Sequence, residues 1–239
     1  MGGSLSLLSV RIKEAGYAER EAVLRDVEFS VGAGELVGLI GPNGAGKSTA
    51  IKSLLRVVKH VKGEIEIGEY AYIPERPLFY DRLTLWEHIE FLATTIGTQE
   101  ADFAKKAESL LDLFKLSDVR FHYPESFSKG MQQKVMLILA FLRQPGLYIL
   151  DEPFIGLDPR ATKDLLNFIQ QEKGRGAGIL MSTHVLDTAE KICDRFLLID
   201  CGRFIATGTL QDIRETSGLA DGSLLDCFDV LTSGRNRND

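Results

Sequence analysis

A glycine-rich stretch, GPNGAGKST at residues 41–49, has the residue types and spacing of a phosphate-binding loop. Its pattern is G-x-x-x-x-G-K-[ST], with Gly46 directly before Lys47 and Ser48. Glycines let backbone N–H groups converge on a phosphate, and a helix that starts here points its positive end at the same place. Lys47 can then reach the β- and γ-phosphates, and the Ser48 hydroxyl can ligate Mg²⁺.

An apolar run precedes this loop and a helical pattern follows it, which is the setting that the pattern requires. We therefore predict a nucleotide phosphate site rather than a chance turn. The predicted nucleotide contacts are Gly41, Pro42, Asn43, Gly44, Ala45, Gly46, Lys47, Ser48 and Thr49.

Two successive acids, Asp151 and Glu152, follow the apolar run LYIL of residues 147–150. Adjacent side chains of a strand point to opposite faces, so two acids at a strand end can serve two different atoms. Asp151 is placed to hold the Mg²⁺ shell, and Glu152 to polarise the water that attacks a γ-phosphate. Two solvated acids in a loop are the plain alternative, but the apolar strand and the upstream loop favour the catalytic roles.

The stretch FSKGMQQK, residues 127–134, starts an apolar helical run and admits two interpretations. Ser128 could be only an N-cap, whose hydroxyl accepts a hydrogen bond from a backbone N–H of the first turn. The same helix start could also bind a ligand. Taken alone, the stretch favours the first interpretation, so the choice depends on the rest of the chain.

The longer pattern predicts an α/β fold with a mostly parallel sheet. Continuous apolar runs at 36–40, 147–150 and 178–181 are typical of strands covered on both faces, whereas 27–31 alternates like a half-buried strand. Helical patterns follow these runs, which is typical of a parallel α/β core. Helices are expected at 47–58 and at 160–173.

Helix starts can be placed from capping patterns. Thr84 with Glu87 and Thr209 with Asp212 have the spacing of capping boxes, and Asp158 precedes a proline at a first helical position. Residues 84–145 carry almost no strand signal. We therefore expect one domain over 1–239, in which 1–83 and 146–239 form the core with a small β-subdomain and 84–145 form an inserted helical subdomain.

Composition excludes several classes of protein. The 239 residues carry a net charge of −6, which does not indicate a nucleic-acid-binding face. No apolar run approaches the roughly 20 residues that span a bilayer. The three cysteines show no metal-binding spacing and the four histidines are scattered, so no zinc site is expected.

At this point the chain resembles the ATP-binding subunits of ABC transporters over nearly its whole length. The order of motifs carries the resemblance: the phosphate loop, FSKGM at the position of the LSGGQ signature, the Asp151–Glu152 strand end, IGLDP, and STH. The resemblance implies a P-loop NTPase core, ATP and Mg²⁺ as ligands, and ATP hydrolysis. It also implies a head-to-tail homodimer in which Ser128 and Gly130 of one subunit face the γ-phosphate held by the other.

The resemblance implies roles for three further residues. Tyr17 matches the aromatic residue that stacks on adenine. Asp158, in IGLDP, matches an acid at the subunit interface, and it can also cap its helix. His184, in STH, matches the histidine that contacts the γ-phosphate and orients the attacking water.

Three positions depart from the family pattern. Glu75 stands where the family usually has a glutamine; a carboxylate can still ligate Mg²⁺ or contact the attacking water, but it donates no hydrogen bond unless protonated. Lys129 and Met131 replace a glycine and the glutamine of LSGGQ, and Lys129 could add charge near the phosphate or face solvent. The segment from Lys47 to Glu75 is also short, which predicts a trimmed β-subdomain.

Within the family, IPERP, the lysine of FSKGM and the ending LLDCFDVLT resemble the ATPase subunit of Ecs-type exporters of Gram-positive bacteria. This implies a cytoplasmic subunit held at the inner face of the membrane by a separate permease, with export as the direction. Residues 75–86 could receive a short helix of that permease or could be ordinary core. A soluble ABC ATPase, such as one for iron–sulfur cluster assembly, is the main alternative, and a regulator without turnover is the other.

Overall fold

The computed structural model describes residues 6–18, 21–98 and 101–233. Its strands are β1 (Ser6–Ala18), β2 (Glu21–Gly32), β3 (Leu36–Ile40), β4 (His60–Ile67), β5 (Tyr70–Ile73), β6 (Leu147–Asp151), β7 (Gly178–Thr183), β8 (Arg195–Asp200) and β9 (Arg203–Gly208). Its helices are α1 (Lys47–Leu54), α2 (Leu85–Ile96), α3 (Ala101–Leu113), α4 (Lys129–Arg143), α5 (Pro159–Gly174), α6 (Leu186–Ile192), α7 (Leu210–Ser217) and α8 (Leu224–Ser233), with 3₁₀ turns η1 (Ser117–Val119) and η2 (Pro124–Ser126).

Two sheets are present in the described part of the chain. The larger has the strand order β5-β6-β7-β3-β8-β9, and all of its pairs are parallel except β8–β9. The smaller, β2-β1-β4, is antiparallel. The predicted α/β fold with a mostly parallel sheet and a small antiparallel sheet is therefore confirmed.

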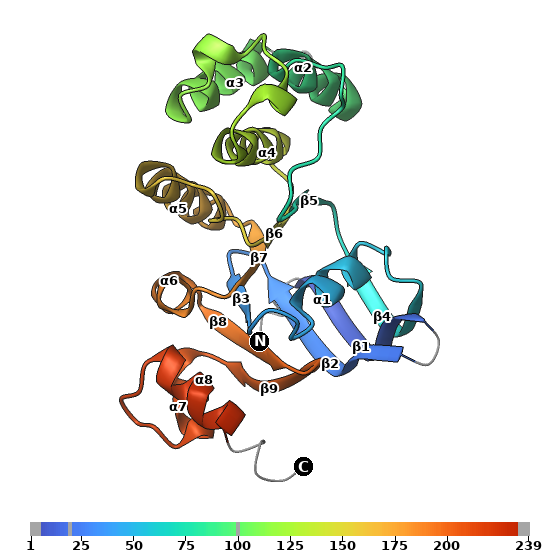
Figure 1. Cartoon of the computed structure of the whole chain (residues 1–239), viewed down its shortest axis with the longest axis vertical. Helices are drawn as coiled ribbons and strands as arrows, with labels where there is room; N and C mark the ends of the chain where they lie inside the picture. Colours follow the sequence, from blue (N-terminus) through green and yellow to red (C-terminus); the bar gives the residue numbers. More distant parts are fainter. Residues whose placement is uncertain (1–5, 19–20, 99–100, 234–239) are drawn as a thin grey trace.

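The larger sheet is central because its middle strands are apolar on both faces. Every residue of β3, β6 and β7 is buried. One face packs on α4 and α5, with α2 and α3 packed on α4 beyond it. The other face packs on α1 and the antiparallel sheet, so α1 lies between the two sheets (Figure 1). A third cluster joins β8 and β9 to α6, α7 and α8. This arrangement brings the carboxyl ends of β3, β6 and β7 together beside the start of α1.

Between β5 and β6 the described residues form helices, 3₁₀ turns and loops but no strand, and the helices α2, α3 and α4 stand at one end of the molecule in Figure 1. The predicted capping boxes at Thr84 and Thr209 are both present, each with the side chain of the third helical residue bonded back to the cap. Asp158 caps α5, with Pro159 as its first residue. The sequence predicts these helix N-termini because each capping hydrogen bond joins residues only a few positions apart.

The predicted helix 47–58 is too long. The helix α1 ends at Leu54, because Arg56 adopts a left-handed backbone conformation (φ 57°) that an α-helix cannot continue. The chain then enters β4 at His60 and reaches β5 at Tyr70, so the short segment before Glu75 contributes one strand to each sheet.

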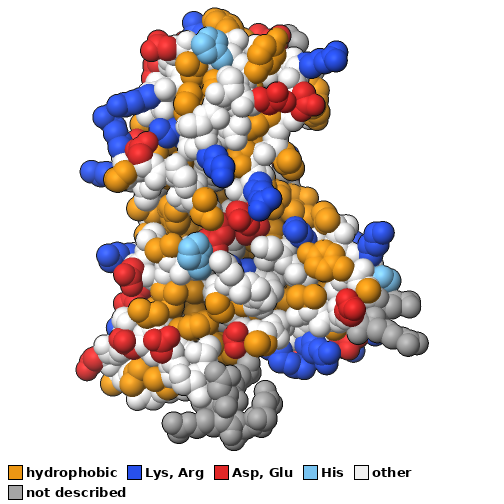
Figure 2. Space-filling model, in the orientation of Figure 1, with side chains coloured by type: hydrophobic (Ala, Val, Ile, Leu, Met, Phe, Trp, Pro, Cys, Tyr) orange, Lys and Arg blue, Asp and Glu red, His pale blue; other side chains and the backbone are white. Residues whose placement is uncertain are grey.

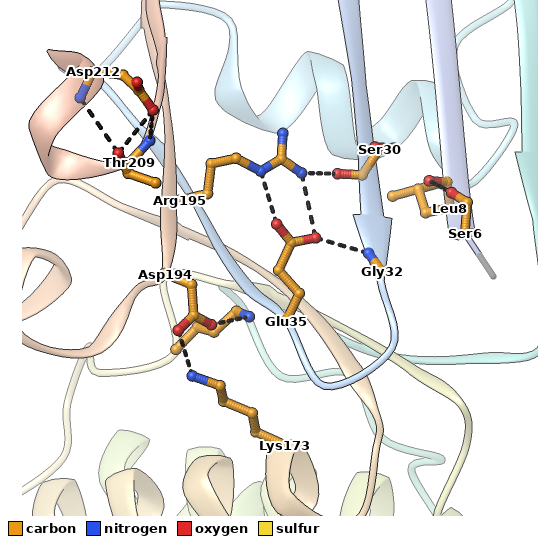
Figure 3. A network of polar contacts seen from close by, with 11 residues as sticks. Ser6, Leu8, Ser30, Gly32, Glu35, Lys173, Asp194, Arg195, Thr209 and Asp212 are labelled. Carbon is orange, nitrogen blue, oxygen red and sulfur yellow. Dashed lines mark hydrogen bonds and ion pairs between the residues drawn. The ribbon is translucent and has the colours of Figure 1, made fainter. Parts of the chain in front are cut away.

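A polar network ties together the amino ends of β3 and β8 (Figure 3). Glu35 accepts hydrogen bonds from Arg195 Nε at 2.8 Å and from the Gly32 N–H at 2.8 Å. Asp194 accepts from the Leu36 N–H at 2.8 Å and pairs with Lys173. These bonds fix the turn from β2 into β3 at the end of the sheet opposite the phosphate loop. None of the helices that the structure describes is long and apolar enough to cross a membrane.

Candidate functional site

A cavity of about 200 Å³ opens at the carboxyl ends of the parallel strands. This edge is where open α/β sheets bind their ligands. The residues that line the cavity are Val23, Pro42, Asn43, Gly44, Gly46, Lys47, Ser48, Thr49, Glu75, Glu152, Ile155 and His184. Acidic and basic side chains gather in the middle of this face, between the α2–α4 helices and the antiparallel sheet (Figure 2).

The phosphate loop is shaped by its glycines. Gly44 and Gly46 have φ values of +84° and +112°, in the region that favours glycine, and a Cβ at Gly44 would meet nothing within 4 Å. The helix α1 starts at Lys47 and has no acidic residue in its first turn, so its positive end is not neutralised by its own side chains. The loop therefore presents backbone N–H groups and open space to the cavity, which suits an anion.

Lys47 is buried beneath this loop. Its Nζ donates to the carbonyl oxygens of Gly41 at 2.7 Å and Pro42 at 3.2 Å, and it lies 3.5 Å from Glu152 Oε1. These carbonyls hold the ammonium group at the floor of the cavity. A phosphate group in the loop would meet a positive charge already in place.

Glu152 occupies an unusual position directly after β6. It is 7% exposed and has a φ of +50°, a left-handed conformation that costs a non-glycine residue energy. His184 Nδ1 lies 2.9 Å from Glu152 Oε2, so this nitrogen carries the proton that the carboxylate accepts. Glu152 Oε1 has no hydrogen-bond partner although it is buried. One carboxylate oxygen is thus held by the histidine, and the other is left for an incoming group.

Asp151 is the last residue of β6 and is buried behind the cavity. Burial raises the pKa of its carboxyl, and the nearby Glu75 and Glu152 carboxylates raise it further. The Ser182 hydroxyl, which donates to Asp151 Oδ1, acts in the opposite direction. A bound cation would offset the cost of ionising Asp151 in this buried place, because a cation favours the ionised form of a carboxyl group.

Glu75 lies on the same side of the site, following β5. It lines the cavity, and its charge, after burial and the charge of Asp151, contributes to raising the pKa of Tyr72 to about 12. Three carboxylates, at positions 75, 151 and 152, therefore share one small volume. The negative charge of these carboxylates suits a bound cation, and the positive charge of Lys47 beside them suits a bound anion.

Tyr17 lies near the end of the β1–β2 hairpin, half exposed and outside the set of cavity-lining residues. Its neighbours Gly16 and Ala18 pair with Ala22 and Glu21 of β2, just before Val23, which does line the cavity. Tyr17 is therefore close to the cavity-lining Val23 in the β1–β2 pairing, and it does not itself line the cavity.

Ser128, Gly130 and Asp158 gather in a separate place. Ser128 is the predicted N-cap of α4, accepting from the Met131 N–H at 3.3 Å. A Cβ on Gly130 would lie 2.4 Å from the Gly156 carbonyl oxygen, so the start of α4 packs directly on the loop that leads to Asp158. Asp158 accepts from the Ala161 N–H at 2.9 Å and from Lys134 at 3.0 Å, and these bonds lower its pKa to about 2.

The site therefore has two parts: a cavity with most of the predicted residues, and an outer group of Ser128, Gly130 and Asp158 that does not line it. Sequence reasoning missed four residues. Val23 and Ile155 line the cavity, and the Ser182 hydroxyl donates to Asp151. Gly156 packs against Gly130 at the start of α4. Ser182 is part of the STH motif, but the sequence does not show which strand lies beside it in the sheet.

Comparison with known proteins agrees with this geometry. A family profile described as ABC transporter matches residues 24–155. The chain is 56% identical over 231 residues to the uncharacterized ABC transporter ATP-binding protein YthP of Bacillus subtilis, covering 96% of this chain and 98% of that one. It is 43% identical over 241 residues to the ABC-type transporter ATP-binding protein EcsA of the same organism, covering 95% and 97%.

A solved structure described as the ATP binding subunit of an ABC transporter superposes with a TM-score of 0.90 at 45% identity, covering 95% of this chain and 99% of that chain. The resemblance to ABC transporter subunits, including the Ecs-type branch, is thereby confirmed. The chain is an ATPase. The chain belongs to the ABC transporter family, as one of its ATP-binding subunits.

Proposed function

We propose that two copies of this chain bind ATP and Mg²⁺ between them, head to tail, and couple hydrolysis to export by a separate membrane permease. The observation that carries the hydrolytic part is Glu152 Oε1: it is buried, lacks a hydrogen-bond partner, and lies 3.5 Å from Lys47. A buried carboxylate oxygen that accepts no hydrogen bond is costly, so it indicates a position kept for a reacting group.

Each residue of the cavity has a definite task in this proposal. Backbone N–H groups of 41–49 and Lys47 hold the phosphates and neutralise charge that develops on them. Glu152 accepts the proton of the attacking water, and His184 holds the Glu152 carboxylate in place through Nδ1. Tyr17 stacks on the adenine.

Mg²⁺ fits the donor set of this site. Ser48, Asp151 and Glu75 offer oxygen ligands, which this hard cation prefers, together with phosphate and water oxygens. When bound, the ion neutralises charge on the transferred phosphoryl group. The raised pKa of Asp151 supports the assignment, since a cation would stabilise its ionised form.

The outer group supports the head-to-tail dimer. Ser128, Gly130 and Asp158 do not line the cavity of their own chain. Ser128 and Asp158 are both exposed, so a second subunit could place its bound nucleotide against them. The N-cap role of Ser128 and the ligand role are compatible, because both use the start of α4.

An apolar groove of about 370 Å³ supports the contact with a permease. Residues 78–80, α2 and α4 line it, and Leu78 is 78% exposed at its edge. Such a groove suits a short amphipathic helix of a partner. The permease-binding surface expected at residues 75–86 would thus also include parts of α2 and α4. The residues that line it are Leu78, Phe79, Tyr80, His88, Phe91, Leu92, Thr95, Met136 and Leu139.

The dimer is tested with Ser128→Arg. The variant should bind ATP as a monomer but fail to dimerise and to hydrolyse it, because the added side chain fills the space for the partner's phosphate. Thr216→Arg, which introduces an arginine on the exposed surface of α7, is the control and should dimerise normally. Normal turnover and dimerisation of Ser128→Arg would refute the dimer.

The transport role is tested by purifying the chain from its host membranes. A permease should co-purify, and replacing Leu78 and Phe91 by Asp should release it without lowering hydrolysis by the isolated subunit. Recovery of the wild-type chain without any membrane protein would favour the alternative of a soluble ABC ATPase. In either case we propose that the chain acts as one domain, with 84–145 as its helical subdomain.

A further inference from the structure

Ser182, on β7, joins the two acids of the site through one hydroxyl group. It lies directly opposite Asp151 in the parallel pairing of β6 and β7, and it is fully buried. Its Oγ donates to Asp151 Oδ1 and accepts from the Glu152 N–H at 3.1 Å. A hydroxyl has one hydrogen and two lone pairs, so both bonds can form at once.

The second of these bonds acts where the backbone is strained. Glu152 has a φ of +50°, and its N–H is shared between Ser182 Oγ and the Ser182 carbonyl oxygen at 3.2 Å. A left-handed residue persists only where its surroundings hold it. This conformation directs the Glu152 carboxylate toward Lys47 and His184.

We infer that Ser182 is a positioning residue for ATP hydrolysis, which orients the Asp151 carboxylate by donating to it and holds the backbone of Glu152. Ser182 does not line the cavity, so it acts through these two acids and not on ATP. The inference rests on the proposed roles of Asp151 toward Mg²⁺ and of Glu152 toward water.

Ser182→Ala removes the hydroxyl but leaves the Ser182 carbonyl bonded to the Glu152 N–H, so the strand should still fold. The outer partners of metal ligands typically contribute about 10- to 100-fold in metal affinity or activity. We expect a kcat lowered by about that factor and a higher Mg²⁺ concentration for half-maximal activity. The affinity for a fluorescent ATP analogue without Mg²⁺ should be unchanged, and the gain in affinity on adding Mg²⁺ should be smaller.

Two further variants separate hydrogen bonding from packing. Ser182→Cys fills nearly the same space with only a weak donor, so it should behave like the alanine variant. Ser182→Thr keeps the hydroxyl and should recover most of the activity. Ser53→Ala is the matched control, because Ser53 is also buried and its hydroxyl bonds only to the Thr49 carbonyl within α1.

The inference is overturned if Ser182→Ala keeps the kcat and Mg²⁺ requirement of the wild type. It is also overturned if Ser182→Cys is fully active. A third result against it would be a Ser182→Ala variant whose loss of activity is explained by its lower melting temperature, with the Mg²⁺ dependence of the wild type. Failure of the proposed function is recognised separately, because the wild type itself would then show no Mg²⁺-dependent hydrolysis.

Discussion

At the amino end of the larger sheet both oxygens of the Glu35 and Asp194 carboxylates accept hydrogen bonds, whereas at its carboxyl end Glu152 Oε1 accepts none. Glu35 accepts from both Arg195 and the Gly32 N–H, and Arg195 also donates to the Ser30 carbonyl at 2.6 Å (Figure 3). At the other end of the same strands, Glu152 keeps a buried oxygen without a hydrogen-bond partner, and burial raises the pKa of Asp151.

The difference separates residues that hold the fold from residues that do chemistry. Carboxylates that accept several hydrogen bonds are stable in their ionised form and gain nothing from a ligand. Carboxylates that are buried with unmet hydrogen-bonding capacity cost stability, and a ligand or cation can remove that cost. Substitutions at the two ends should therefore have opposite effects on stability and on turnover.

Glu152→Gln should give the largest effect. We expect kcat to fall by about 10²–10⁴-fold while ATP still binds, because the amide cannot accept the proton of the attacking water. Steady-state phosphate release and nucleotide binding measure the two quantities. Unchanged turnover would show that Glu152 is not the general base. The carboxyl end of the sheet would then not differ from the amino end in carrying catalytic carboxylates.

Glu35→Ala should weaken the fold without changing the chemistry. The change removes the acceptor of the Gly32 N–H and of Arg195 Nε, and it leaves Arg195 with its bond to the Ser30 carbonyl. We expect the free energy of unfolding to fall by about 2 kcal/mol, as for other part-buried donors left unpaired. Urea denaturation measures this, with kcat unchanged below the transition. A loss of kcat in the folded variant would contradict the division between the two ends.

Asp151→Asn should do the opposite, raising the stability of the nucleotide-free protein while abolishing Mg²⁺-dependent hydrolysis. The pKa of Asp151 is raised in the fold, so its ionised form costs stability at neutral pH, and Asn removes that cost. A gain of about 1 kcal/mol is expected near pH 7. It should shrink as the pH falls toward the unfolded pKa of about 3.9, where the wild-type carboxyl is protonated too.

Thermal denaturation of the Asp151→Asn variant at several pH values provides the measurement, with Glu35→Gln as a control that changes charge at the other end. An asparagine variant that is less stable than the wild type at pH 7 would show that Asp151 is a structural residue like Glu35.

Lys173→Met should give the smallest effect. Lys173 pairs with Asp194, but both side chains are partly exposed, and Asp194 keeps its bond from the Leu36 N–H. Pairs of this kind contribute about 0.2–1 kcal/mol. The melting temperature should therefore change little, with less dependence on salt concentration. A loss as large as that of Glu35→Ala would mean that the whole amino-end network acts as one unit.

Local patterns in the sequence determined much of this protein. The phosphate loop at 41–49, the strand end at Asp151 and Glu152, and the caps at Ser128 and Asp158 depend on residues a few positions apart, so their spacing predicts them. The apolar runs of β3, β6 and β7 likewise predicted a parallel sheet, because strands covered on both faces are apolar throughout.

Only the tertiary structure decided which of these parts meet. Ser182 faces Asp151 because β6 and β7 are neighbours, and Gly130 meets Gly156 because α4 packs on the loop after Glu152. Glu35 and Arg195 are 160 residues apart in the chain. Such contacts depend on strand order and helix packing, which are set by burial of the whole apolar surface and leave no signal in local spacing.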